Sequence, residues 1–123
     1  METITEYLGK ILGDLESVGG IELSAIVSKQ GLLMASGNLG TGTTGEAFAA
    51  LTATLYMSAQ STILRLSNEK TKSIIVETQD KHLITYAAGH DALIVVLVGE
   101  EGFIGLILNE LKKAAEKVQK ILS

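Results

Sequence analysis

The loop from Gly40 to Gly45 is the first candidate for chemistry, because its sequence GTGTTG matches the G-x-G-x-x-G pattern of dinucleotide-binding turns. That chemistry also requires an acidic residue about 20 residues later, at the end of the next parallel strand. The first acids beyond the helix that follows are Glu69, in a turn, and Glu77. A P-loop starting at Gly37 is also incomplete, because Thr43 stands where lysine must neutralise the phosphates. We therefore expect a flexible loop with a capping threonine and no nucleotide site.

Side chains that could act as nucleophiles, acid–base groups or metal ligands are sparse. The sequence has no cysteine, which excludes a thiol nucleophile, a disulfide and a zinc–thiolate site. The two histidines, His82 and His90, are predicted in exposed turns and lack the convergent partners that a metal site or a catalytic triad requires. Glu100 and Glu101 are adjacent, so their side chains point in different directions at the start of a helix. Their negative charges there interact favourably with the helix dipole. We expect no enzyme activity, no metal and no cofactor.

Arg65 is the only arginine, and a lone arginine could serve as an arginine finger for a GTPase partner. It falls in the last turn of a predicted helix, however, where a cation is stabilising for electrostatic reasons alone. We expect this structural role for Arg65.

Length and composition predict one globular domain over residues 1–123, enough to bury roughly two-thirds of the unfolded surface. The net charge of −4 and the lack of a basic cluster argue against nucleic-acid binding. The lysines near the C-terminus alternate with Glu110 and Glu116, as on a solvated helix face. The N-terminal residues do not have the pattern of a signal peptide. We expect a cytoplasmic protein that does not insert into a membrane.

The hydrophobic periodicity predicts the order αββαβββα. Apolar residues at helical spacing, or in short runs bounded by glycine and polar turns, define these elements. The expected helices are 4–18, about 47–66 and 103–122, and the expected strands are 22–28, 32–37, 72–78, 82–88 and 92–98. Thr3 with Glu6 and Thr43 with Glu46 predict capping boxes at the first two helices. The short connections require antiparallel pairing, so we expect an α+β fold: an α/β/α sandwich around a five-stranded antiparallel sheet.

The strongest signal is the segment Ala47–Leu64, whose eighteen residues include no charged side chain. A helix without a charged face must be covered on more than one side, and its many hydroxyl and amide groups exclude a membrane span. A helical wheel gives a bulky stripe (Phe48, Leu51, Leu55, Ala59 and Leu66) and an alanine-rich stripe (Ala49, Ala53, Tyr56, Gln60 and Ile63). We expect the bulky stripe to lie on the sheet and the alanine-rich stripe to meet a second copy of the chain. The alternative is a monomer that buries this helix under its own loops.

Four segments in this order and spacing resemble the Roadblock family, which contains the dynein light chain Roadblock and bacterial gliding-motility regulators of Ras-like GTPases. The segments are KQGLLMASG, the small-residue helix, HLITYAAG and DALIVVLVGEEGFIGLILNELKKAAEKV. Gly31 and the pair Gly105–Leu106 match the family pattern best. The resemblance covers essentially the whole chain and includes no catalytic signature.

The resemblance implies a profilin-like sandwich that dimerises through the second helix and the third strand, with one continuous sheet across the pair. The interface expected from it and from the alanine-rich stripe comprises Ala49, Ala53, Tyr56, Met57, Gln60, Ile63, Leu64, Ser73 and Ile75. The implied function is a homodimeric, non-catalytic scaffold or regulator that binds a small Ras-like GTPase and remodels its switch regions. Linkage of cargo to motors would require eukaryotic partners, which the sequence does not indicate.

A small-ligand sensor is the alternative function, because profilin-like sandwiches elsewhere enclose ligands between sheet and helix. A deep pocket lined by the first and last helices would favour the sensor, and a tightly filled core would favour the scaffold. An enzyme is a third and weaker hypothesis.

Overall fold

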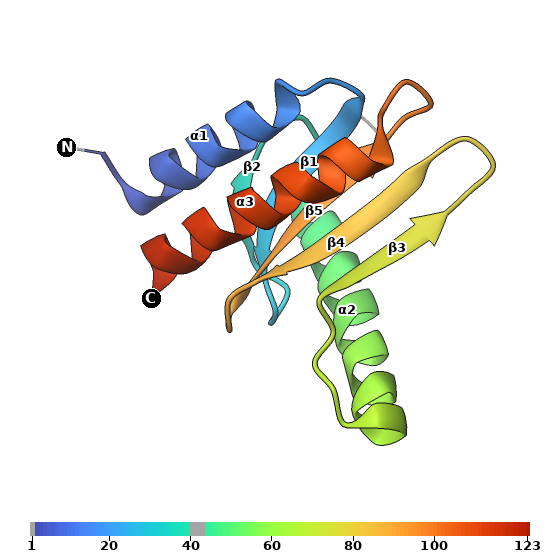
Figure 1. The fold of residues 1–123 in the computed structure, drawn as a ribbon. Helices are drawn as coiled ribbons and strands as arrows, with labels where there is room; N and C mark the ends of the chain where they lie inside the picture. Colours follow the sequence, from blue (N-terminus) through green and yellow to red (C-terminus); the bar gives the residue numbers. More distant parts are fainter. Residues whose placement is uncertain (1, 40–43) are drawn as a thin grey trace.

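The structure, a computed structural model that describes residues 2–39 and 44–123, has the predicted element order (Figure 1). Its elements are α1 (Ile4–Glu16), β1 (Ile21–Ser28), β2 (Leu33–Ser36), α2 (Gly45–Ser67), β3 (Ser73–Glu77), β4 (His82–Ala88), β5 (Ala92–Val98) and α3 (Ile104–Leu122). The strands form one antiparallel sheet in the order β2-β1-β5-β4-β3. Helices α1 and α3 cover one face and α2 crosses the other, which confirms the predicted α/β/α sandwich.

Strand β5 is the centre of the sheet because all seven of its residues are apolar. Ile94 and Val96 point into the core under α1 and α3, whereas Leu93 and Val95 point into the core under α2. Such a strand is stable only where both faces of the sheet are covered. Its pairing with β1 on one side and β4 on the other places it there.

Helices α1 and α3 run antiparallel across one face of the sheet, and the N-terminus of α1 lies beside the C-terminus of α3 (Figure 1). Each buries a single stripe, which includes Leu8 and Leu12 on α1 and Ile107 and Leu111 on α3. The predicted cap of α1 is confirmed, because Thr3 Oγ1 accepts a hydrogen bond of 3.1 Å from the Glu6 amide.

The N-cap residue of α2 lies one position later than predicted. Its N-cap is Thr44, whose hydroxyl oxygen accepts from the Ala47 amide at 3.1 Å. Thr43 lies outside the described residues, as does most of the glycine-rich loop. The helix ends at Asn68, which has a left-handed φ of 57° and donates its amide to the Leu64 carbonyl. Asparagine tolerates this conformation better than most residues do.

The prediction about which stripe of α2 faces the sheet is wrong for Leu51 and Leu66, although Phe48 of the same stripe packs on the core below α2. Ala49 and Ala53, 0% and 3% exposed, lie against the sheet, while Leu51 and Leu66, 69% and 78% exposed, face away from it. The helix contacts the turn between β1 and β2, where a Cβ atom at Gly31 would lie 3.5 Å from the Ala50 Cα. The small side chains of Ala50 and Ala53 fit this contact, and Tyr56 fills the core below the next turn of the helix.

The reversed orientation changes what a charge at Ala53 should do. We expect Ala53→Glu to lower the free energy of unfolding by about 3 kcal/mol or more, because it forces a carboxylate into the core below α2. Urea denaturation followed by circular dichroism measures this change.

The matched control is Ala47→Glu, which adds the same side chain at an exposed alanine of α2. Equal stability of the two variants would contradict the orientation of α2 in the structure.

Candidate interaction surfaces around helix α2

The predicted interface residues divide into a buried group and an accessible group. Ala49, Ala53 and Tyr56 pack within this chain, and Tyr56 is only 2% exposed. These residues support the chain's own core below α2, and a place for them in a dimer interface stays a prediction. The accessible group stays a prediction and comprises Met57, Gln60, Ile63, Leu64, Ser73 and Ile75.

The C-terminal half of α2 extends beyond the sheet (Figure 1). Every residue from 61 to 70 is exposed, although Ile63, Leu64 and Leu66 are large and apolar. Leu51 and Leu66, which the sequence analysis assigned to the sheet, are exposed on the outward side of α2, and Ile63 and Leu64 are exposed on other sides of its last turns. We call these four exposed side chains the α2 stripe. Several large exposed apolar residues on one element mark an interaction site.

Strand β3 is an edge strand, as the predicted pairing requires, and its outer backbone groups face no other strand of the described chain. Ile75 pairs with Ile84 and therefore lies on the α3 side, whereas Val76 pairs with Leu83 and lies on the α2 side. Both Ile75 and Val76 are exposed. An edge strand with exposed apolar residues on both faces is well suited to pairing with another strand.

A hydrogen-bonded cluster ties α2 to the start of β3. The Tyr56 hydroxyl donates to the Thr71 carbonyl at 2.6 Å, and the Thr71 amide donates to Gln60 Oε1 at 2.6 Å. Burial raises the pKa of Tyr56, so the phenol stays protonated and keeps this donor. Gln60, predicted at the interface, thus also holds the connection between α2 and the start of β3.

We expect Tyr56→Phe to lower the free energy of unfolding by about 1–2 kcal/mol, because it leaves the Thr71 carbonyl without its donor. Thermal or urea denaturation measures the loss.

Tyr7→Phe is the matched control: Tyr7 is exposed, and no hydrogen bond from its hydroxyl is present among the described residues. A loss at Tyr7→Phe as large as at Tyr56→Phe would contradict a specific role for the Tyr56 hydroxyl.

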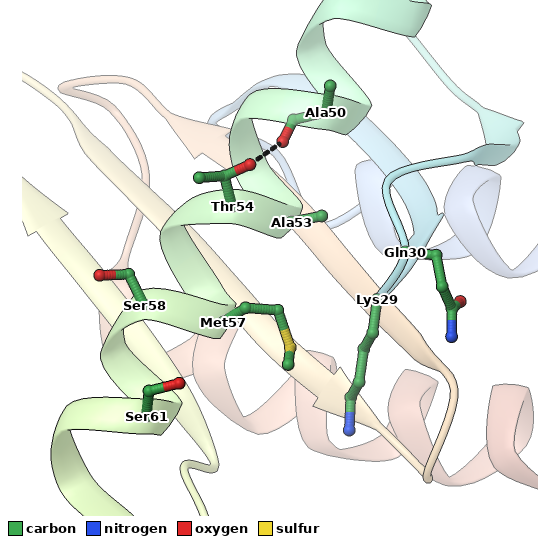
Figure 2. A pocket seen from close by; sticks show the side chains of 8 residues that line it. All are labelled: Lys29, Gln30, Ala50, Ala53, Thr54, Met57, Ser58 and Ser61. Atoms are coloured by element: carbon green, nitrogen blue, oxygen red, sulfur yellow. Dashed lines mark hydrogen bonds between the residues drawn. The ribbon is translucent and has the colours of Figure 1, made fainter.

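A groove of about 440 Å³ runs along the side of α2 that faces the turn joining β1 to β2 (Figure 2). Small side chains of α2 form one wall, and the Thr54 hydroxyl donates to the Ala50 carbonyl there at 2.8 Å. Lys29 and Gln30 form the other wall. The lining is Lys29, Gln30, Ala50, Ala53, Thr54, Met57, Ser58 and Ser61.

Lys29 is the charged group of this groove. Its ammonium lies 5.4 Å from the centre of the Tyr56 ring and donates to the Gly89 carbonyl at 3.4 Å. Burial lowers the pKa of Lys29, with a partly opposing contribution from Asp91. Within the described residues no carboxylate forms an ion pair with it. A half-buried cation without a paired anion favours a ligand or partner that supplies one.

The residues considered for catalysis are not brought together. His90 is exposed as predicted, but His82 is half-buried, and its Nε2 lies 3.0 Å from a Glu77 carboxylate oxygen. The exposed-turn prediction for His82 is wrong because the strand register pairs it with Glu77. Arg65 lies in the last turn of α2, as predicted. In residues 2–39 and 44–123, no group of three or more His, Cys, Asp or Glu side chains could hold a metal ion.

The groove between α1 and α3, which a ligand sensor would need, measures only about 50 Å³. Ligand pockets typically enclose roughly 300–1,000 Å³, so this groove does not favour the sensor hypothesis. No helix of the described chain is long and apolar enough to cross a bilayer.

These layers and strand order define the profilin-like class of α/β/α sandwiches. Profilin II from Acanthamoeba castellanii superimposes with a TM-score of 0.65 at 17% identity, covering 89% of this chain and 94% of the profilin. A family model, the Roadblock/LC7 domain, matches residues 7–98, so the chain belongs to the Roadblock/LC7 domain family.

Structures of MglB have the same fold. The gliding protein MglB from Thermus thermophilus has a TM-score of 0.89 at 18% identity, covering 98% of this chain and 92% of that protein. An MglB with a tetrameric arrangement gives the same TM-score and identity and covers 98% of this chain and 91% of its own. No curated protein sequence matches the chain.

Proposed function

We propose that this protein is a cytoplasmic, homodimeric and non-catalytic regulator that binds a Ras-like small GTPase. The proposal rests on two exposed surfaces that are neighbours in the fold. They are the α2 stripe and the edge of β3 that pairs with no other strand of the described chain. Membership of the Roadblock/LC7 family supports a regulatory or adaptor role.

A two-fold axis perpendicular to the sheet at the middle of β3 would complete both surfaces at once. It sets a second β3 antiparallel to the first and places the second α2 on the same face of the combined sheet. The extended half of each α2 then lies toward the partner and not in water. Burying one large apolar side chain contributes about 1.5–3 kcal/mol, so a few such residues of the α2 stripe on each copy are enough to stabilise a pair.

We expect Leu51→Glu to convert the dimer into a monomer, because it places a charge in the apolar stripe where the partner packs. Sedimentation equilibrium at micromolar concentration gives the mass.

The control is Ser61→Glu, which adds the same charge on the groove side of α2. A Leu51→Glu protein that keeps the dimer mass would reject this interface.

We propose that the groove at Lys29 stays accessible in such a pair, with Met57 shared between the rim of the groove and the predicted dimer interface. Its hydroxyl and amide groups, with the unpaired ammonium, suit a carboxylate presented by a protein partner. We propose this flank of α2 as the contact surface for the GTPase. Regulation would then act on the shape of the GTPase switch regions, since no described side chain is placed to supply chemistry.

We expect Lys29→Met to weaken GTPase binding by about tenfold or more, because a charge-assisted hydrogen bond contributes roughly 1.5–3 kcal/mol. Isothermal titration with the Ras-like GTPase of the source organism, loaded with GDP or a GTP analogue, measures the affinity.

Lys112→Met removes an exposed lysine on the far face and serves as the control. Absence of any GTPase complex with the unmodified protein would refute the proposed function itself. Unchanged affinity of Lys29→Met would refute only the assignment of the groove.

A further inference from the structure

Lys29 differs from every other lysine of the described chain in its surroundings. It is half-buried and lines the groove beside α2, whereas the other lysines are exposed. Among the described residues, no carboxylate forms an ion pair with its ammonium. Three of the exposed lysines do form such pairs, which are Lys10–Glu2, Lys81–Glu22 and Lys113–Glu110. The Lys29 amine is therefore reached from a groove and is not neutralised by a carboxylate.

The charged and titratable groups around Lys29 come from three neighbouring elements. Lys70, in the connection between α2 and β3, repels the Lys29 ammonium, and Asp91, in the turn between β4 and β5, attracts it. His90 of that turn is exposed, and Tyr56 of α2 presents the face of its ring. Burial, helped by Lys70, lowers the pKa of Lys29 against the effect of Asp91. More of this amine is therefore unprotonated near neutral pH than at an ordinary lysine.

The groove gives a small electrophile access to this amine. Its volume of about 440 Å³ lies in the range of roughly 300–1,000 Å³ that is typical of small-molecule sites. An unprotonated Lys29 keeps two N–H bonds, so it can donate to the Gly89 carbonyl at 3.4 Å and still offer its lone pair to a bound molecule. The Ser58 and Ser61 hydroxyls line the same groove and can donate to an acyl oxygen (Figure 2).

We propose that Lys29 is a site of N-acylation by small acyl phosphates, with Lys70 positioning the phosphoryl group of the donor. The unprotonated Lys29 nitrogen attacks the acyl carbon, so a C–N bond forms and the C–O bond to the phosphoryl group breaks. Inorganic phosphate leaves with the electron pair of that bond and takes up the proton that the nitrogen loses. The product is a neutral amide at Lys29, and no oxidant or further reactant is needed.

An acyl phosphate is the donor class that suits two neighbouring lysines. A second cation beside a lysine keeps more of that lysine unprotonated and therefore nucleophilic. The same cation attracts the phosphoryl dianion, which brings the acyl carbon toward the groove. A neutral ester gains only the first of these two effects, so the two donor classes can be told apart by experiment.

Acylation would remove the charge that makes this groove suitable for a carboxylate. The amide has no positive charge, so the charge-assisted hydrogen bond proposed for the GTPase cannot form. This regulatory consequence rests on the proposed function, whereas the acylation step itself does not.

The test incubates the unmodified chain with acetyl phosphate at about pH 8 and follows acetylation of each lysine by peptide mass spectrometry. Lys112 is the reference, because it is exposed and forms no ion pair within the described chain. We expect the initial rate at Lys29 to be about threefold or more above that at Lys112, and to level off at a lower pH. A rate at Lys29 equal to or below the rate at Lys112 overturns the proposal.

Lys70→Met tests the positioning role, with Lys72→Met as the matched control on an exposed lysine of the same connection. We expect Lys70→Met to slow acetylation of Lys29 by acetyl phosphate about threefold or more, and to slow the reaction with p-nitrophenyl acetate, a neutral ester, by less. Lys72→Met leaves both rates unchanged. An equal effect of Lys70→Met on the two donors overturns the role of Lys70 in holding the phosphoryl group.

The regulatory consequence has its own measurement. Lys29→Gln carries a neutral amide as acetylated Lys29 does, and we expect it to weaken GTPase binding about as much as Lys29→Met does, about tenfold or more. GTPase affinity that is unchanged after acetylation of Lys29 overturns this consequence. A failure of the proposed function appears separately, because no GTPase complex then forms while the acetylation rates stay as expected.

Discussion

The structure depends on covering both faces of one apolar strand. Strand β5 has no polar face, so the sheet is stable only with helices on either side. Helices α1 and α3 together cover one face, whereas α2 alone covers the other. A single helix cannot cover a twisted sheet of five strands, and α2 leaves half of its own length off the sheet. The unequal coverage of the two faces is the origin of the apolar surface at α2 and β3.

The sequence is sufficient to predict the fold because its local signals agree with one another. The seven-residue apolar run and the glycine-punctuated hairpins give the order of elements along the chain, and strands β4 and β5 begin and end where the periodicity predicts. Helix boundaries shift by one or two residues at α1 and α3, because hydrophobic spacing does not fix the terminal residue of a helix. The cap at Thr44 shows the same limit, since this residue caps α2 although it has no glutamate three residues later.

The candidate site was harder to predict, for a physical reason. A helical wheel separates the two stripes of α2, but it does not state how near the helix lies to the sheet. In the structure Ala49, Ala53 and Tyr56 pack inward and Leu51 faces outward, while the turn at Gly31 contacts Ala50 and Ala53. The Lys29 groove was also missed. Its signal, a lysine in a hairpin turn facing a run of small helical residues, appears only once the turn and the helix are placed together.

Strand β2, only four residues long, forms the other edge of the sheet. Once β3 is paired in the proposed dimer, β2 is the remaining place where a further strand could add, and its pairing with β1 is already interrupted by a register shift. So short and irregular a border offers few hydrogen bonds to an incoming chain. In the proposed dimer, growth by strand addition would therefore stop at one pair, and the wide continuous sheet would not become a seed for fibrils.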